Sequence, residues 1–201
     1  MMANVPLILA SASAARRRLL SDAGIPFEAM APRLDEAALK AALARAGATP
    51  ANMADALAEA KAVKLSARRP EALVLGADQV LVCEGRVHDK PMDRAAARAQ
   101  LRILSGRTHR LVCAAVIAAA GRPVWRHAET ARLHVRPLSD AFIEAYLDQE
   151  GKKLLGCLGA YRLEGMGVQI FEKIEGDHFA ILGLPLLAVI AYLRTRAMVP
   201  A

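Results

Sequence analysis

Aromatic side chains are scarce in this sequence of 201 residues, at 4% of the total. Hydrophobic residues nevertheless make up 55% of the chain, so alanine, leucine and valine must fill its core. Few aromatics also mean few surfaces on which unpaired bases could stack, and no known nucleic-acid-binding motif is present. The composition therefore predicts a globular protein with a sizeable core and argues against a stable nucleic-acid partner.

Cysteine is scarce as well, with three widely spaced residues at Cys83, Cys113 and Cys157. An odd number at such spacing is not a disulfide framework, and no CxxC pair is present to hold a metal. The five histidines show no ligand spacing such as HxxxH. We therefore predict reduced thiols, which favours the cytoplasm, and assign no histidine or cysteine to a metal.

No apolar run reaches the roughly 20 residues of a membrane-spanning helix. The nearest candidate, residues 181–193, is short and is interrupted by Gly183 and Pro185. Residues 5–10 are apolar and precede small residues that resemble a signal-peptidase site, but no positive charge comes before this short run. We expect neither a membrane partner nor a cleaved leader.

Short apolar runs and amphipathic segments alternate along the chain. The pattern predicts strands at residues 5–10, 25–31, 72–77, 80–83, 86–88, 107–119, 123–135, 168–174 and 178–182. It predicts helices at residues 14–23, 36–46, 49–69, 93–104, 139–149 and 186–196. We expect the last two strands to pair as a hairpin around residues 175–177. With no repeat and no clear linker, the sequence predicts an α/β or α+β fold with a mixed sheet, as one domain over residues 1–201.

The formal charge is +7, from 27 basic and 20 acidic residues. A basic balance suits an anionic partner, which could be nucleic acid, a membrane surface or a phosphorylated metabolite. It suits plain solubility equally well. The charge alone therefore leaves these possibilities open.

The loop before the first predicted helix has the residue types of a phosphate site. Ser11 and Ser13 lie in the loop, and the helix begins with Arg16, Arg17 and Arg18. Helix N-terminal N–H groups, hydroxyls and guanidinium groups all favour a bound phosphate. An ordinary capped helix with solvated arginines explains the same residues. The loop matches neither GxxxxGK[ST] nor GxGxxG, so it is not a P-loop or a Rossmann fingerprint.

Four further charged residues could take part in chemistry. Asp78 follows a predicted buried strand, where α/β sheets place ligands, although a turn aspartate bonded to backbone amides is as good an explanation. Glu36, Lys61 and Lys90 lie near predicted strand or helix ends, and for each one a solvated surface charge is the simpler interpretation. None of the four identifies a site by itself.

Taken together, these segments resemble the Maf family. The resemblance runs in order through nearly the whole chain, and the ordered set is far more specific than any single motif. Its segments are residues 11–17 (SASAARR), 35–36 (DE), 59–62 (EAKA), 75–80 (LGADQV), 90–91 (KP), 104–109 (LSGRTH), 159–161 (GAY), 164–165 (EG), 174–176 (IEG) and 183–185 (GLP).

The resemblance implies a mixed, strongly curved central sheet flanked by helices, with two lobes around a cleft. It implies a nucleoside triphosphate pyrophosphatase that releases a nucleoside monophosphate and pyrophosphate, with Mg²⁺ or Mn²⁺ as cofactor. It also implies a cytoplasmic homodimer. The implied roles are phosphate binding by Ser11, Ser13, Arg16, Lys61 and Lys90, metal binding by Glu36 and Asp78, and general-base catalysis by Asp78.

The resemblance also concerns three positions that bear on which nucleotide base is selected. The resemblance assigns base selection to Gln79 and Glu164, and this pair matches the branch that prefers 7-methyl-GTP. The branch for dTTP and UTP typically has threonine and glutamine there. Ala15 stands where family branches carry a large arginine or tryptophan, and Ala14 stands where the family usually has proline. A pyrimidine pyrophosphatase of the same family and a non-catalytic nucleic-acid-binding division regulator are the alternatives.

Overall fold

The computed structural model describes residues 5–200. Its sheet of seven strands has the order β2-β1-β3-β5-β6-β7, and β4 pairs with β3 outside this path. The strands are β1 (Leu7–Leu9), β2 (Glu28–Ala29), β3 (Leu73–Cys83), β4 (Arg86–His88), β5 (Thr108–Ala119), β6 (Arg122–Val135) and β7 (Phe171–Glu175). β1 runs parallel to β2 and β3, whereas β4 and β7 are antiparallel to their partners, so the sheet is mixed as predicted.

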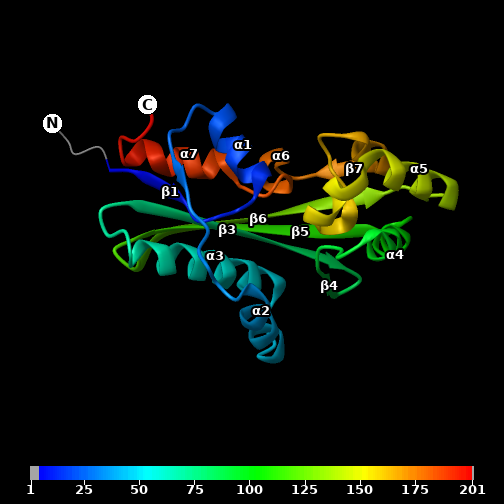
Figure 1. Ribbon diagram of the computed structural model, residues 1–201, viewed down its shortest axis with the longest axis horizontal. Helices are drawn as coiled ribbons and strands as arrows, with labels where there is room; N and C mark the ends of the chain where they lie inside the picture. Colours follow the sequence, from blue (N-terminus) through cyan, green and yellow to red (C-terminus); the bar gives the residue numbers. More distant parts are fainter. Residues whose placement is uncertain (1–4, 201) are drawn as a thin grey trace. The chain divides into compact units, whose positions relative to one another are not determined.

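Seven α-helices accompany the sheet in the described part of the chain (Figure 1). They are α1 (Ala14–Asp22), α2 (Glu36–Arg45), α3 (Pro50–Ser66), α4 (Arg94–Leu104), α5 (Asp140–Glu150), α6 (His178–Ile181) and α7 (Leu186–Thr195). Three 3₁₀ helices follow α5, namely η1 (Gly151–Gly156), η2 (Leu158–Ala160) and η3 (Met166–Ile170). None of the helices within residues 5–200 is long and apolar enough to span a bilayer.

The chain folds into two compact units. The first unit comprises Met1–Gln79, Cys113–Glu129 and Asp177–Ala201, and the second comprises Val80–Val112 and Thr130–Gly176. The long strands β3, β5 and β6 therefore contribute one end to each unit.

Both faces of the sheet are buried in the first unit. Alternating residues of a strand point to opposite faces. Leu7 and Leu9 pack with residues of α1 and α7, whereas Ile8 and Ala10 pack on the other face with Leu65 of α3. Figure 1 shows α1 and α7 on one side of these strands and α3 on the other. The two apolar faces explain why β1 and β3 have nearly continuous hydrophobic sequences.

The second unit contains α4, α5, the three 3₁₀ helices, β4, β7 and the remaining ends of β3, β5 and β6. α4 and α5 are joined by ion pairs of Arg94 and Arg98 with Glu144 and of Arg102 with Asp140. The interior contains Tyr146, which is fully buried, together with His109, whose Nε2 lies 2.7 Å from the hydroxyl of Tyr161.

Several helix ends were correctly predicted because their caps are local. Thr49 and Asp93 accept hydrogen bonds from the backbone N–H groups of Asn52 and Ala96, as N-caps do, and Pro50 is the first residue of α3. Gly24, at φ 67°, follows the end of α1 in a left-handed conformation that suits glycine.

The predicted hairpin around residues 175–177 is wrong. β7 ends at Glu175, and residues 178–181 form the helix α6 rather than a strand. Asp177 begins this helix, because its Oδ1 accepts a 2.6 Å hydrogen bond from the backbone N–H of Ala180. A short apolar run does not distinguish a strand from a buried helical turn.

Other strand predictions also need correction. The strand predicted at residues 168–174 is shifted to Phe171–Glu175, because Met166–Ile170 form the 3₁₀ helix η3. The strand predicted at residues 25–31 is reduced to Glu28–Ala29. The strands predicted at residues 72–77 and 80–83 are one continuous strand, β3, so Asp78 lies within a strand and not in a turn after one. The parallel pairing of β3 with β1 stops at Leu75, however, and β3 continues past the end of β1, where it pairs with β4 from Leu81 to Cys83.

Candidate functional site

Lys61 lies between two carboxylates of the first unit. Its ammonium nitrogen is 2.6 Å from Oδ1 of Asp78 and 2.7 Å from Oε2 of Glu36. The side chain of Lys61 is 5% exposed, that of Asp78 is 14% exposed and that of Glu36 is 50% exposed. A buried ammonium is costly unless it is paired, and these two carboxylates provide its partners. The solvated lysine that an alanine-rich helix suggests is therefore not what the structure has.

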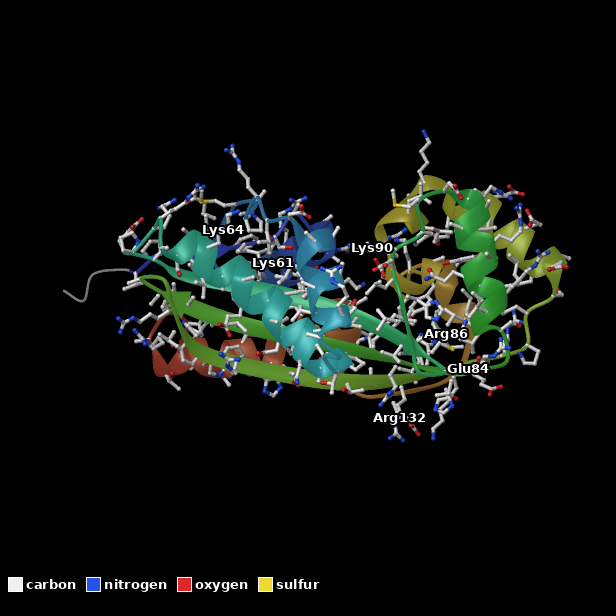
Figure 2. The ribbon with its side chains drawn as sticks, turned by 90° about the horizontal axis from the view of Figure 1, so that it is seen from below. Lys61, Lys64, Glu84, Arg86, Lys90 and Arg132 are labelled. Atoms are coloured by element: carbon white, nitrogen blue, oxygen red, sulfur yellow. The ribbon has the colours of Figure 1, made fainter. Side chains whose placement is uncertain are left out.

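A glycine in β3 allows this arrangement. A Cβ atom at Gly76 would lie 2.2 Å from the carbonyl oxygen of Ala58 and 2.8 Å from the backbone nitrogen of Ala62, both in α3. Only a residue without a side chain lets helix and strand approach so closely. Lys61 lies on α3 and Asp78 lies on β3. The close approach of the two elements at Gly76 therefore brings the ammonium group and the carboxylate together. Figure 2 shows Lys61 on α3, with Lys64 on the same helix.

The loop after β1 brings Ser11 and Arg16 together. The Oγ of Ser11 accepts a hydrogen bond from the backbone N–H of Ser13 at 3.1 Å and one from Nη1 of Arg16 at 3.3 Å. Nε of Arg16 donates to the carbonyl oxygen of Gly183 at 2.7 Å. Ser13 caps α1, because its Oγ accepts from the backbone N–H of Arg16. The guanidinium group is thus held at the start of α1, where the positive end of the helix dipole also lies.

The β1–β3 ladder relates this loop to Asp78. Leu9 pairs with Leu75, and the backbone N–H of Ala10 donates to the carbonyl oxygen of Leu75. Ser11 follows Ala10 directly, and Asp78 comes three residues after Leu75. Both segments therefore continue beyond the same end of the ladder, the carboxyl end of β1, which is where α/β sheets bind ligands.

Gln79 uses its amide nitrogen inside the protein. Nε2 donates to the carbonyl oxygens of Ala180 at 2.8 Å and Ile181 at 3.0 Å, both in α6. These two bonds fix the orientation of the amide and leave Oε1 as the acceptor that can meet a ligand. Ala15 is half-buried in the first turn of α1.

Lys90 and Glu164 belong to the second unit. Lys90 is exposed between β4 and α4 and is labelled in Figure 2. Glu164 precedes η3, and its Oε1 lies 3.4 Å from Nη2 of Arg162. The structure thus brings together Glu36 with Lys61 and Asp78, and separately Ser11 and Ser13 with Arg16.

Sequence reasoning missed the residues that support the predicted ones. Gly76, the carbonyl group of Gly183 and the Glu150–Arg162 pair each hold a predicted side chain in place or let it approach its partner. The two glycines lie in segments that carry the family resemblance, which was the only available signal for them. Nothing in the sequence distinguished Glu150 from other charges on a helix.

A divalent metal fits the pair of carboxylates. No group of three or more histidine, cysteine, aspartate or glutamate side chains that could hold a metal occurs within residues 5–200. Glu36 and Asp78 nevertheless share one cation, the ammonium of Lys61, and carboxylate oxygens are the ligands that Mg²⁺ prefers. Mg²⁺ commonly takes one or two protein carboxylates and completes its shell with water and substrate phosphates.

Known proteins resemble the chain over almost its full length. It is 51% identical over 193 residues to the nucleoside triphosphate pyrophosphatase of Caulobacter vibrioides, covering 96% of each protein. It is 51% identical over 195 residues to the 7-methyl-GTP pyrophosphatase of Rhizobium meliloti, covering 97% of this chain and 98% of that protein. The 7-methyl-GTP pyrophosphatase of Rhizobium etli is 50% identical over 188 residues, which is 94% of each chain.

Residues 6–196 also match the model of the family described as "Maf-like protein". That match and the identities of about one half over nearly the whole length agree with the segments that carry the resemblance. The chain belongs to the Maf family.

Proposed function

We propose that residues 1–201 act as one Maf-like domain that hydrolyses a nucleoside triphosphate to a nucleoside monophosphate and pyrophosphate, with 7-methyl-GTP as the preferred substrate. The observation that supports it most strongly is the contact of Lys61 with Glu36 and Asp78, beyond the same end of the sheet as the Ser11–Arg16 loop. Relatives at about 50% identity bear the names of such pyrophosphatases.

The phosphates bind at the loop after β1. The guanidinium group of Arg16 is already oriented by Ser11 and Gly183, so little ordering is needed when an anion arrives. Ser11 and Ser13 contribute hydroxyl groups, and Lys61 and Lys90 contribute positive charge. These groups recognise phosphate and carry no information about the base.

Asp78 accepts the proton of the attacking water. The water oxygen forms a bond to the α-phosphorus while the bond from that phosphorus to the bridging oxygen breaks, and pyrophosphate leaves with the bonding electrons. Oδ1 of Asp78 is bonded to Lys61, so Oδ2 is the oxygen available to the water. Glu36 and Asp78 would hold a divalent cation, Mg²⁺ or Mn²⁺. When bound, this cation would neutralise the negative charge that develops on the phosphate oxygens.

The base is selected by hydrogen-bond acceptors. Guanine presents two adjacent donors, its N1–H and its exocyclic amine, and a carboxylate such as that of Glu164 accepts from both. The 7-methyl group makes the ring cationic, which adds attraction to a carboxylate. Gln79 offers Oε1 because its nitrogen is already occupied. Ala15 is too small to stack on the ring, so selection depends on Gln79 and Glu164.

The test is turnover of a panel of nucleotides by the purified protein, with release of pyrophosphate as the readout. Faster hydrolysis of dTTP or UTP than of 7-methyl-GTP would favour the pyrimidine alternative. No turnover of any triphosphate would favour the non-catalytic nucleic-acid-binding alternative. The homodimer and the cytoplasmic location remain predictions from the family resemblance, and light scattering of the purified protein tests the first.

A further inference from the structure

Glu150 is a buried carboxylate at the end of α5, in the second unit. It is 7% exposed, and both of its oxygens are engaged. Oε2 accepts a 3.0 Å hydrogen bond from Nη1 of Arg162, and Oε1 accepts a 3.0 Å hydrogen bond from the backbone N–H of Met166. One side chain therefore holds two points of the segment that contains Glu164.

Two glycines show how tightly this segment packs. A Cβ atom at Gly165 would lie 2.6 Å from Oε1 of Glu150, and one at Gly167 would lie 2.3 Å from the carbonyl oxygen of Arg162. The backbone N–H of Arg162 also donates to the hydroxyl of the buried Tyr146, at 3.2 Å. Because the segment is fixed before and after Glu164, the backbone position of Glu164 is set by residues of α5.

Arg162 links Glu150 to the side chain of Glu164 and so orients the carboxylate of Glu164. Its Nη1 binds Glu150 while its Nη2 lies 3.4 Å from Oε1 of Glu164. The guanidinium group is planar and rigid, so fixing one side of it fixes the other. Glu164 is 36% exposed in its side chain and so remains open to a ligand.

The charges of the three side chains matter as much as their positions. Two carboxylates share one guanidinium group, so Glu150, Arg162 and Glu164 together retain a net negative charge. Arg162 directs its closer contact, 3.0 Å, to Glu150 and its longer one, 3.4 Å, to Glu164. Glu164 is thus oriented by Arg162 without being fully neutralised by it.

We infer that Glu150 is a positioning residue for base selection, acting through Arg162 on the carboxylate of Glu164. The inference rests on the proposed role of Glu164 in choosing the base. Without the negative charge of Glu150, Arg162 pairs fully with Glu164, and the attraction of that carboxylate for a cationic purine ring is lost.

The variant Glu150→Gln tests this inference. Glutamine has nearly the same size and its carbonyl oxygen still accepts from Met166, but the negative charge is gone. We expect the ratio of kcat/KM for 7-methyl-GTP over dTTP to fall about tenfold, mainly through KM for 7-methyl-GTP. Glu144→Gln is the matched control, because Glu144 lies on the same helix and pairs with Arg94 and Arg98, and its ratio should equal that of the wild type.

The double variant decides whether Glu150 acts through Glu164. If it does, Glu150→Gln lowers the ratio no further when Glu164→Gln is already present. A further fall in the double variant would overturn the inference. If Glu150→Gln does not fold, Arg162→Lys replaces it, because a lysine keeps the charge but lacks the planar fork that links Glu150 to Glu164. The ratio should then fall through the lost orientation of Glu164, and it should fall no further when Glu164→Gln is already present; an unchanged ratio would overturn the inference.

A structural readout separates this inference from the proposed function. If Glu164→Gln alone leaves the base preference unchanged, the base assignment of the proposed function is wrong. The crystal structure of Glu150→Gln then tests the positioning by itself. A displaced Glu164 carboxylate supports it, and an unmoved carboxylate contradicts it.

Discussion

The ammonium nitrogen of Lys61 lies 2.6 Å from Oδ1 of Asp78, in the buried space between α3 and β3. Glu36 approaches the same nitrogen to 2.7 Å. A lysine thus occupies the position between two carboxylates where a divalent cation would be expected. This relationship joins the predicted phosphate-binding residue to the predicted metal ligands, and it makes the roles of all three testable.

Replacing Asp78 by asparagine should abolish the proposed base and leave the fold intact. We expect turnover to fall about 10²–10⁴-fold, the usual effect of a positioned general base, with an unchanged circular dichroism spectrum. Asp55→Asn is the matched control, because Asp55 is a carboxylate on α3 that pairs with Arg126 and has no proposed role. A folded Asp78→Asn protein with near-normal turnover would rule out the proposed mechanism.

Replacing Lys61 by methionine should strengthen metal binding and weaken phosphate binding. Without the ammonium, Glu36 and Asp78 repel each other and attract a divalent cation more strongly. We expect Mn²⁺, titrated without nucleotide and followed by electron paramagnetic resonance, to bind more tightly than to the wild type. We also expect kcat/KM to fall similarly for all triphosphates.

Lys64→Met is the control for this change, since Lys64 lies on the same helix and donates to the backbone carbonyl of Arg33 (Figure 2). Its Mn²⁺ affinity should match that of the wild type. Unchanged Mn²⁺ affinity in Lys61→Met would show that the two carboxylates do not form the metal site.

Stability should decrease in mild acid because of His109. Burial, with smaller contributions from repulsion by His88 and His134, lowers the pKa of His109 from 6.5 to about 4. Between about pH 6.5 and pH 4, His109 is therefore protonated in the unfolded chain and neutral in the folded chain. The contribution of His109 to the free energy of unfolding is fully present above about pH 6.5. It is lost as the pH falls toward 4, by up to about 1.4 kcal/mol per pH unit.

Urea unfolding at pH 7.5 and pH 5 measures this effect. His109→Gln keeps a polar partner for the hydroxyl of Tyr161 and should show a smaller loss of stability between the two values than the wild type. His88→Gln removes one of the weaker repulsions and should reduce the loss by less than His109→Gln does. Equal pH dependence in wild type and His109→Gln would show that another group is responsible.

Base preference should follow Gln79 and Glu164. The combined change Gln79→Thr with Glu164→Gln places the residues of the pyrimidine branch at both positions. We expect the ratio of kcat/KM to shift from 7-methyl-GTP toward dTTP and UTP, because an amide can donate to a pyrimidine carbonyl and a carboxylate cannot. An unchanged ratio in the folded double variant would mean that other residues choose the base.

Local signals were enough for part of the fold. Thr49 with Pro50 and Asp93 marked helix starts correctly, because a cap is a contact between residues three apart in the chain. The apolar strands β1 and β3 were recognisable because both of their faces are buried. The strand predicted at residues 178–182 failed because Asp177 caps a single helical turn there, and a run of four residues has no readable period.

The candidate site was harder to predict from the sequence than the fold was. By residue type alone, Lys61 was better explained as a solvated lysine, and only the ordered set of family segments suggested a role for it. Its burial depends on the close approach of α3 to Gly76, which is a tertiary contact between residues 14 or more apart. The same holds for Glu150, whose partners Arg162 and Met166 come near only when the chain turns back after α5.

The most direct test of the account is the stoichiometry of products from 7-methyl-GTP. The purified wild-type protein with Mg²⁺ is incubated with the nucleotide, and the products are separated by ion-exchange chromatography. The account predicts one 7-methyl-GMP and one pyrophosphate per triphosphate consumed, at a higher kcat/KM than for dTTP or UTP. Release of orthophosphate with 7-methyl-GDP, or no hydrolysis of any triphosphate, would contradict it.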